Sequence, residues 1–238
     1  MAEDTDAWGQ PVGPVVTGWE RRPPITPVEL TGRYATLEPL DVPRHVDDLH
    51  AANGADDGRM WTYLPYGPFP DLLAYRTWME GFAGDDQLVA FAIVDRRRAT
   101  AAGVVAYARI VPDDGACEIA HVALSPGVRR SAVATDALAL LLRHAFDLGY
   151  RRCEWKCDAL NEPSRRAACR LGFTYEGTFR QAKVVRGRNR DTAWFAMTDA
   201  DWPPVRSALD AWLDPANFDA EGRQRRALSA LTRQALGR

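Results

Sequence analysis

The sequence has no long apolar run, no excess of charge of one sign and only four cysteines. No stretch approaches the roughly 20 apolar residues of a membrane-spanning helix. The N-terminal MAEDTDAWGQ is acidic, where a secretory signal is basic and then apolar. A formal net charge of -2 over 238 residues gives no general attraction to nucleic acid or anionic membranes. We therefore expect a cytoplasmic protein without a membrane partner.

The cysteines include no C-x-x-C pair of the kind found in zinc and thioredoxin sites; they are Cys117, Cys153, Cys157 and Cys169. Cys153 and Cys157 share one face of an alternating segment, CEWKC. This pattern favours buried, reduced thiols over a disulfide or a metal centre. The sequence therefore predicts no metal site.

Composition divides the chain into one domain with two extensions. Residues 1–30 hold five prolines and two tryptophans, Trp8 and Trp19, without helical or alternating period, which predicts an extended arm. Because isolated indoles in a free tail are unusual, we expect the arm to lie on the body or on a second subunit, which leaves a homodimer open. Residues 31–213 form the domain. Residues 214–238 are predicted as a helical surface tail, with oligomer contact or RNA phosphate binding as secondary interpretations.

The central stretch, residues 117–148, is predicted as a strand, a tight turn and a long helix. Cys117 to Leu124 is an almost continuous apolar run that ends at Ser125-Pro126-Gly127. Apolar residues then recur at helical period, at Ala134, Ala137, Leu138, Leu141, Ala145 and Leu148. The first amides of a helix have no internal partner and attract anions. Either an ordinary crossover or an anion site is therefore expected at Arg129, Arg130, Ser131, Ala132, Val133 and Ala134, where two arginines add charge and small side chains leave the backbone accessible.

Alternation, capping residues and turns place the other elements. Strands are predicted at 34–40, 88–95, 101–111, 150–158, 174–185 and 191–198, and helices at about 41–52, 72–82, 161–172 and from 201 onward. The right-handed crossover rule makes 150–158 a parallel neighbour of 117–124, with the intervening helix on one face of the sheet.

An aromatic loop, WTYLPYGPFPD, covers residues 61–71. Its three prolines exclude a regular element, so an irregular loop presents the rings of Trp61, Tyr63, Tyr66 and Phe69. Two interpretations are equally favoured. The loop packs on the core, or it forms one wall of a pocket for a substrate.

Two signatures resemble those of the GCN5-related N-acetyltransferase (GNAT) superfamily. LSPGVRRSAVATDA is similar to the acyl-CoA diphosphate segment, whose pattern is Gln or Arg, two residues, Gly, one residue, and Gly or Ala. Arg129 stands at the first position, and Ala132 and Ala134 stand at the two glycine positions. About 30 residues later, Asn161 and Ser164 followed by Leu-Gly-Phe match the second signature. YEGTFR and DTAWFAMTDADW look like the last strands of the RimJ and RimL branch, so the resemblance covers roughly residues 32–212.

The resemblance implies an α/β (α+β) fold, with a mixed sheet of about seven strands and helices on both faces. It implies an acyltransferase that moves an acyl group from acetyl-CoA or another acyl-CoA to an amine. The loop at 129–134 would bind the diphosphate, Asn161 and Ser164 would contribute to the donor site, and the backbone of Val122, Ala123 and Leu124 would align the pantetheine. Asn161 or Tyr175 would assist the departing thiolate.

Two residues are candidates for the general base. Glu118 is the first, because a carboxylate deep in an apolar strand needs a partner or a function. His121 is the second, because an unperturbed histidine has a pKa of about 6.5. Period two places them on opposite faces of the strand, so both serve only if the strand bulges between them.

Several alternatives stay open at this point. Succinyl-CoA, an acyl carrier protein or aminoacyl-tRNA could replace acetyl-CoA as the donor, since nearby arginines suit any donor that carries phosphate. The acceptor is an amine of a small molecule or of a protein N-terminus. A non-catalytic acyl-CoA binding module is the alternative from a different class.

Overall fold

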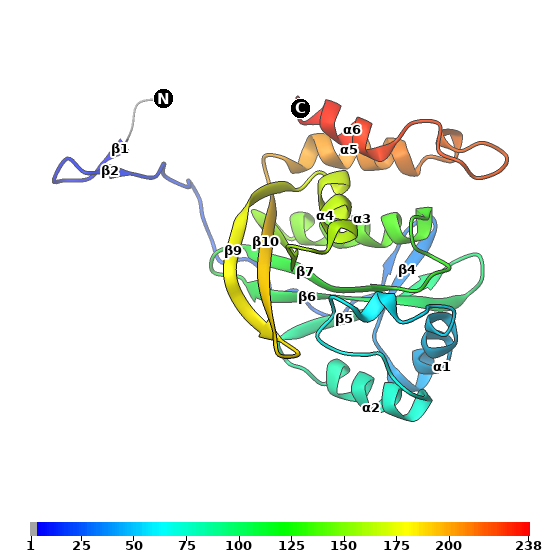
Figure 1. The fold of residues 1–238 in the computed structure, drawn as a ribbon. Coiled ribbons are helices and arrows are strands. Elements are labelled where there is room, and N and C mark those ends of the chain that lie inside the picture. Colours follow the sequence, from blue (N-terminus) through cyan, green and yellow to red (C-terminus); the bar gives the residue numbers. More distant parts are fainter. Residues whose placement is uncertain (1–3) are drawn as a thin grey trace.

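The computed structural model describes residues 4–238 and shows one twisted sheet between two layers of helices (Figure 1). The eight strands have the order β3-β4-β5-β6-β7-β8-β10-β9. They are β3 (Leu30–Thr31), β4 (Ala35–Pro39), β5 (Leu88–Asp95), β6 (Thr100–Val111), β7 (Ala116–Leu124), β8 (Arg152–Asp158), β9 (Thr174–Val185) and β10 (Arg188–Thr198). Neighbouring strands are antiparallel except for β7 and β8, which are parallel.

Each face of the sheet carries its own helices and its own apolar core. One face is covered by α1 (Val42–Asn53) and α2 (Leu72–Ala83), and the other by α3 (Ala132–Asp147), α4 (Glu162–Leu171) and α5 (Trp202–Leu213). The last helix, α6 (Leu228–Ala235), packs on α4 and α5. Two short 3-10 turns lie at Arg59–Trp61 and Pro215–Asn217.

The predicted fold class is confirmed, with the parallel β7–β8 pair and α3 as its crossover. The sheet has eight strands where about seven were expected. The additional strand is the edge strand β3, in which Leu30 and Thr31 pair with Leu37 and Thr36. So short a pairing leaves no alternating pattern in the sequence, which is why period two does not predict it.

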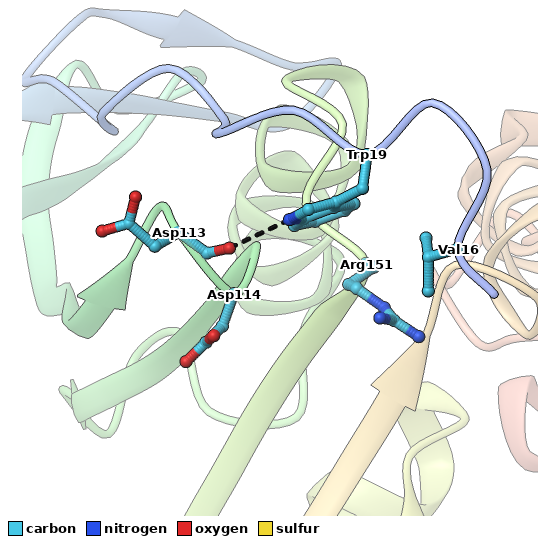
Figure 2. Close-up of a pocket in the computed structure, with 5 residues that line it drawn as sticks. All are labelled: Val16, Trp19, Asp113, Asp114 and Arg151. Carbon is cyan, nitrogen blue, oxygen red and sulfur yellow. Dashed lines mark hydrogen bonds between the residues drawn. The ribbon is translucent and has the colours of Figure 1, made fainter. Parts of the chain in front are cut away.

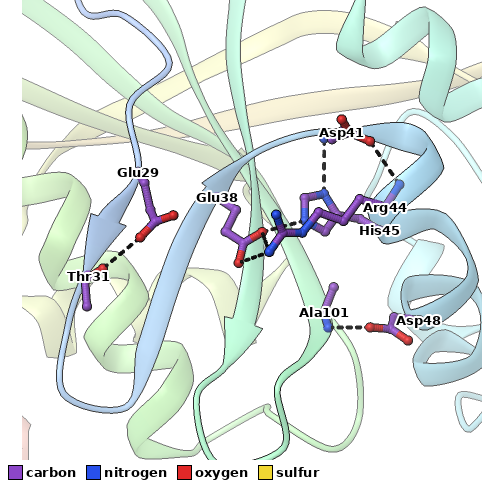
Figure 3. A network of polar contacts seen from close by, with 8 residues as sticks. All are labelled: Glu29, Thr31, Glu38, Asp41, Arg44, His45, Asp48 and Ala101. Atoms are coloured by element: carbon purple, nitrogen blue, oxygen red, sulfur yellow. Dashed lines mark hydrogen bonds and ion pairs between the residues drawn. The ribbon is translucent and has the colours of Figure 1, made fainter.

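Polar contacts fix α1 against the sheet (Figure 3). Glu38 on β4 accepts a hydrogen bond from Arg44 at 3.0 Å and lies 3.0 Å from Nε2 of the buried His45. Asp48 accepts from the main-chain nitrogen of Ala101 on β6 at 3.1 Å. Because these groups span β4, α1 and β6, they hold the helix layer in register with the strands that carry the site.

The parallel pair β7–β8 separates partway along its length. Ladder pairing runs from Ala116 opposite Arg152 to Ile119 opposite Trp155 and stops there, although β7 continues to Leu124 and β8 to Asp158. From residue 120 onward the β8-facing edge of β7 therefore has no strand partner. Exposed main-chain groups of this kind need another partner or a ligand.

The N-terminal arm has a fixed base and a projecting tip. Trp19 donates to the carbonyl oxygen of Asp113 at 3.1 Å, Tyr150 donates to that of Pro23 at 3.0 Å, and Ile25 is buried. The tip is a two-stranded hairpin, β1 (Asp4–Thr5) and β2 (Pro11–Val12), that stands away from the body (Figure 1).

In the C-terminal tail, only residues 228–235 form an α-helix, which buries Leu228 and Leu231. Cys117, Cys153 and Cys157 are buried and reduced, and Cys169 is exposed. Within residues 4–238, no helix is both long and apolar enough to span a membrane, and no group of acidic, histidine or cysteine side chains has the arrangement of a metal site.

Candidate functional site

A bulge in β7 brings the two candidate bases to one face of the sheet. Two residues, His121 and Val122, stand opposite the single residue Val105 of β6, and His121 has the left-handed backbone angle φ of 54°. The extra residue reverses the alternation that would have placed His121 opposite Glu118. Both side chains lie on the face that carries α2. A left-handed backbone is costly for a residue other than glycine, and such strain gathers at functional sites.

His121 lies among aromatic rings. Its imidazole is stacked on the Tyr66 ring at 5.8 Å between centroids and meets the Phe82 ring edge-on at 5.0 Å. The ring nitrogens of His121 form no hydrogen bond within residues 4–238, unlike those of His45. They are free to meet a ligand. Burial lowers the pKa of His121, and Lys183 lowers it further while Asp85 opposes. The lowered pKa favours the neutral imidazole near pH 7.

Glu118 has a different environment, because basic side chains surround it. Its carboxylate lies 2.5 Å from Lys156 Nζ and 3.9 Å from Arg109 Nε. Lys156 also lies over the Trp194 ring, at 4.5 Å. Burial raises the pKa of Glu118, and the charges of Lys156 and Arg109 oppose that rise. Alternation along β8 predicts that Glu154 and Lys156 lie on one face of the sheet. In the structure this is the face on which Glu118 lies.

The same face continues into an open cavity beyond Glu118. It has a volume of about 440 Å³ and is lined by arginine and acidic side chains, among them Arg109, Arg152, Glu154 and Asp199. Arg152 is held by Glu154 at 2.9 Å and by Glu176 at 2.6 Å. Charged groups of both signs line this cavity, so it suits a polar molecule better than an apolar one.

On the other side of the separated strands, the first turn of α3 offers unpaired main-chain nitrogens. Ser131 caps the helix through a bond from Ala134 N to its Oγ at 3.3 Å. The nitrogens of Arg130, Ala132 and Val133 form no hydrogen bond within residues 4–238. Ser131, Ala132 and Val133 are half-buried and Arg130 is exposed, whereas Ala134 is buried. The nitrogens are therefore accessible, as the predicted anion site requires.

Arg129 is already engaged inside the protein. Its Nε donates to the carbonyl oxygen of Leu124 at 2.9 Å, and its Nη2 lies 2.7 Å from the carboxylate of the buried side chain of Asp56. These contacts hold the turn against the end of β7. Arg130, which has a left-handed φ of 58° and is exposed, is the arginine of the pair that is free to reach a ligand.

Asn161 and Ser164 form the start of α4, just after the end of β8. Asn161 Oδ1 accepts from Ser164 N at 3.1 Å and caps the helix. Ser164 Oγ accepts from Trp155 Nε1 at 3.0 Å. The acceptor atoms of both side chains are thus used within the chain, and each side chain is half-buried at the β8 side of the strand separation.

Tyr175 lies apart from the candidate bases. Tyr175 is exposed, its ring packs at 5.4 Å on Phe195 of the core on the α3 side of the sheet, and its hydroxyl lies 2.7 Å from Thr178 Oγ1. The structure therefore does not bring Tyr175 together with His121. The Tyr175 ring lies toward α4, and the guanidinium of Arg165 on that helix is 5.9 Å from the ring.

The aromatic loop is mainly packed on the core. Trp61 is buried, and its ring meets that of Phe69 at 5.3 Å, while Tyr63 is half-buried. Tyr66 is the ring of the loop that reaches His121, and its buried hydroxyl has no hydrogen-bond partner within residues 4–238. Packing on the core is therefore what the structure shows for most of the loop, and a role of Tyr66 in a substrate pocket stays a prediction.

Sequence reasoning missed two contributors to this site, Phe82 and Arg186. Arg186, at the tip of the β9–β10 hairpin, donates to the carbonyl oxygens of Tyr66 at 2.7 Å and Gly67 at 2.5 Å. The hairpin thereby closes onto the aromatic loop. The basic turn was visible in the sequence, but its partner about 120 residues away was not.

The chain is similar to known proteins in both sequence and structure. Residues 35–174 match the family model described as an acetyltransferase (GNAT) domain. The chain belongs to the GNAT acetyltransferase family. Among curated proteins, no sequence matches it. The matched residues include β7, the start of α3 and the start of α4, which together surround the strand separation.

Solved structures agree with the family. A GCN5-related N-acetyltransferase from Brucella melitensis is 41% identical, with 91% of this chain and 99% of that chain covered and a TM-score of 0.89. A probable GNAT-family acetyltransferase from Chromobacterium violaceum is 42% identical, with 81% and 97% covered and a TM-score of 0.76. RimL, a ribosomal L7/L12 alpha-N-protein acetyltransferase, is 22% identical, with 72% and 94% covered and a TM-score of 0.61, a likeness of fold.

The predicted activity class is therefore confirmed. The protein is a transferase that moves an acyl group from a coenzyme A thioester to an amine. Amide nitrogens without partners within residues 4–238, an unpaired strand edge and an imidazole without a hydrogen bond lie around one strand separation.

Proposed function

We propose that the protein transfers an acetyl group from acetyl-CoA to a primary amine, with His121 accepting the proton that the amine loses. The observation that carries this assignment is the free imidazole on a bulge beside the separated strands. Its lowered pKa keeps it unprotonated at neutral pH, and a general base must be unprotonated to act.

The reaction needs one proton removed and one supplied. The amine nitrogen attacks the thioester carbonyl carbon, the carbon–sulfur bond breaks, and the sulfur leaves as a thiolate that takes up a proton. A ring nitrogen of His121 receives the proton from the amine, directly or through a water molecule. The rings of Tyr66 and Phe82 exclude bulk water from one side of the imidazole and hold it in place.

The donor would lie on the α3 side of the strand separation. The free nitrogens of Arg130, Ala132 and Val133 suit a diphosphate, and the small side chain of Ala132 leaves the backbone accessible where the family pattern has its first glycine. The unpaired edge of β7 at Val122, Ala123 and Leu124 suits the amide groups of a pantetheine arm. Arg129 would support this turn from inside, since Asp56 and Leu124 already hold its guanidinium.

Near the thiolate, Asn161 and Ser164 are the proposed contributors. The free amide nitrogen of Asn161 is a hydrogen-bond donor at the start of α4, where the helix dipole also favours negative charge. Tyr175 is less well placed for this role, because its hydroxyl contacts Thr178 and its ring lies toward α4.

The acceptor would enter on the opposite face, between His121 and the charged cavity beyond Glu118. Tyr66 is the ring of the aromatic loop that reaches His121, and the Trp61 ring packs against it at 6.1 Å. A mixed set of charges favours an acceptor that carries polar groups besides its amine. Both a small-molecule amine and a protein N-terminus meet that description.

Glu118 is the alternative base. Its carboxylate is bound to Lys156 at 2.5 Å, and accepting a proton would break that ion pair. We therefore assign Glu118 to holding Lys156 and Arg109 along the acceptor face, where it shapes the site without exchanging protons.

Calorimetry and product analysis test the proposal together. Titration of the protein with acetyl-CoA, succinyl-CoA and free CoA should show binding of both CoA and acetyl-CoA. Mass spectrometry of reactions with a panel of amines and N-terminal peptides should then show a gain of one acetyl group. Binding of CoA without acetylation of any amine would favour the acyl-CoA binding module, and failure to bind any CoA would favour a carrier-protein or tRNA donor.

A further inference from the structure

The tip of the N-terminal arm exposes apolar side chains that its own chain does not cover. Trp8 is 84% exposed and Val15 is 82% exposed, and Val12 and Val16 are each 45% exposed. The tip is nevertheless ordered by local bonds, since Asp6 Oδ1 accepts from the main-chain nitrogens of Trp8 and Gln10 at 2.9 Å. An ordered turn that presents a tryptophan to solvent is typical of a contact surface.

The base of the arm is anchored to the body at Trp19 (Figure 2). Trp19 donates to Asp113 and packs between two guanidinium groups, with Arg22 at 4.5 Å and Arg151 at 5.6 Å from its ring. Arg22 N also donates to the carbonyl oxygen of Pro112 at 3.0 Å. The arm is thus a fixed projection and not a loose tail from Trp19 onward.

The outer edge of the sheet offers a surface of matching chemistry. β9 is the last strand in the sheet order, so one of its edges has no ladder partner within residues 4–238. Phe179 and Val184 on this strand are 57% and 79% exposed. A long exposed edge strand that carries apolar side chains invites pairing with another chain.

Charge complements the apolar match. Residues 1–20 contain four acidic residues and no basic residue, whereas residues 177–190 contain five basic residues and no acidic residue. Arg180, Lys183 and Arg188 form no salt bridge within residues 4–238. An acidic arm with an aromatic tip and a basic strand with exposed apolar residues are therefore complementary.

We propose that the arm tip of one copy docks on the β9–β10 hairpin of a second copy, and that two such contacts form a homodimer. Because each copy has one arm and one hairpin, a two-fold axis lets both contacts form and closes the assembly. Trp8, Phe179 and Val184 are not among the candidate site residues, but Arg186 of the same hairpin holds the aromatic loop, so the test measures assembly and not activity. Every copy of the chain carries both an arm and a hairpin that matches it. A second copy therefore supplies both halves of the contact.

Light scattering coupled to gel filtration tests the assembly on the full chain. The unaltered protein should have the mass of a dimer, and Trp8→Ser should weaken the dimer by about tenfold or more, as expected for loss of a central aromatic anchor. Phe179→Ser with Val184→Ser should have the same effect. Leu73→Ser is the matched control, since Leu73 is 72% exposed but lies on α2, and it should leave the mass unchanged.

Mixing the variants separates this contact from others. The Trp8→Ser chain keeps its hairpin and the Phe179→Ser/Val184→Ser chain keeps its arm, so their mixture should recover heterodimers through one intact contact. A monomeric unaltered protein at about 100 µM would overturn the proposal, since a specific homodimer is expected to form at that concentration. A dimer that survives Trp8→Ser, or a mixture that recovers no heterodimer, would overturn it as well.

Discussion

The two halves of β7 contrast in how they satisfy their polar groups. In the paired half, residues 116–119, the ladder to β8 is intact and Glu118 is bound by Lys156. In the unpaired half, residues 120–124, the ladder ends and His121 has no polar partner within residues 4–238. The polar groups of the first half have partners within the chain. Those of the second half, the β8-facing edge and the His121 imidazole, have none within residues 4–238.

This contrast explains why two titratable residues three positions apart have different expected roles. Buried charges in a paired strand stabilise the fold only together with their partners. An imidazole without a polar partner can be replaced without leaving a buried charge unpaired, and it is free to exchange a proton. Variants of the two residues should therefore separate activity from stability.

The largest expected effect is on turnover. His121→Ala removes the proposed base, and kcat should fall by about 10²- to 10⁴-fold, the usual contribution of a general base. Glu118→Gln keeps the shape of the side chain and should lower kcat by a smaller factor. Steady-state kinetics with one amine that the product analysis has identified measures both. Equal loss in the two variants would remove the contrast, and a greater loss in Glu118→Gln would make Glu118 the base.

The next effect concerns the donor side of the separated strands. Ala132→Glu places a carboxylate among the free nitrogens of α3, where it competes with a diphosphate. CoA should bind about 10- to 100-fold more weakly in calorimetry, or about 1.4–2.8 kcal/mol. The helix itself should gain about 0.3–1 kcal/mol from an acid in its first turn. Ala132→Gln is the neutral control, and equal affinity in the two variants would argue against a diphosphate at this turn.

A third prediction tests the paired half by its stability. Glu118→Gln leaves the nearly buried Lys156 without its ion pair, so the free energy of unfolding should fall by about 1–3 kcal/mol. Glu176→Gln breaks a more exposed ion pair with Arg152 and should cost about 0–1 kcal/mol. Urea denaturation of both variants measures the difference. His121→Ala leaves no buried charge unpaired, so its cost should come from the lost ring contacts with Tyr66 and Phe82, about 0.5–1.5 kcal/mol for each pair.

The framework of this contrast could be predicted from the sequence. Apolar runs and helical period place β7, α3 and β8 within one or two residues, and the crossover rule makes β7 and β8 parallel. The capping residue Asn161 marks the start of α4. These features follow from local chemistry, which a single sequence contains.

The detail that decides the chemistry could not be predicted in this way. The bulge at His121 arises because two residues of β7 stand opposite Val105 alone, and a register shift between strands depends on both strands together. The stacking of Tyr66 on His121 and the contact from Arg186 to the loop join segments about 55 and 120 residues apart. Contacts of this range depend on how the layers pack and not on local pattern.

The smallest expected effect is a shift in the pKa of His121, which can be measured without any substrate. The ring nitrogens are followed by NMR against pH, and the His121→Gln variant identifies the signal among four histidines. The pKa should lie below the ordinary value of about 6.5, because burial disfavours the charged imidazolium. A lowered pKa keeps the neutral base populated to a lower pH, so the acidic limb of kcat should extend below pH 6.5 by the same amount.

The aromatic rings around His121 give this measurement its control. Tyr66→Phe keeps the stacked ring and should leave the pKa where it is, whereas Tyr66→Leu opens one side of the imidazole to water and should raise the pKa toward its ordinary value. Asp85 and Lys183 are the charged groups that act on His121, and both stay in place in either variant. A pKa at or above 6.5 in the unaltered protein would mean that the unpaired half of β7 is as well solvated as an exposed strand. The imidazole would then have no advantage over Glu118 as the base.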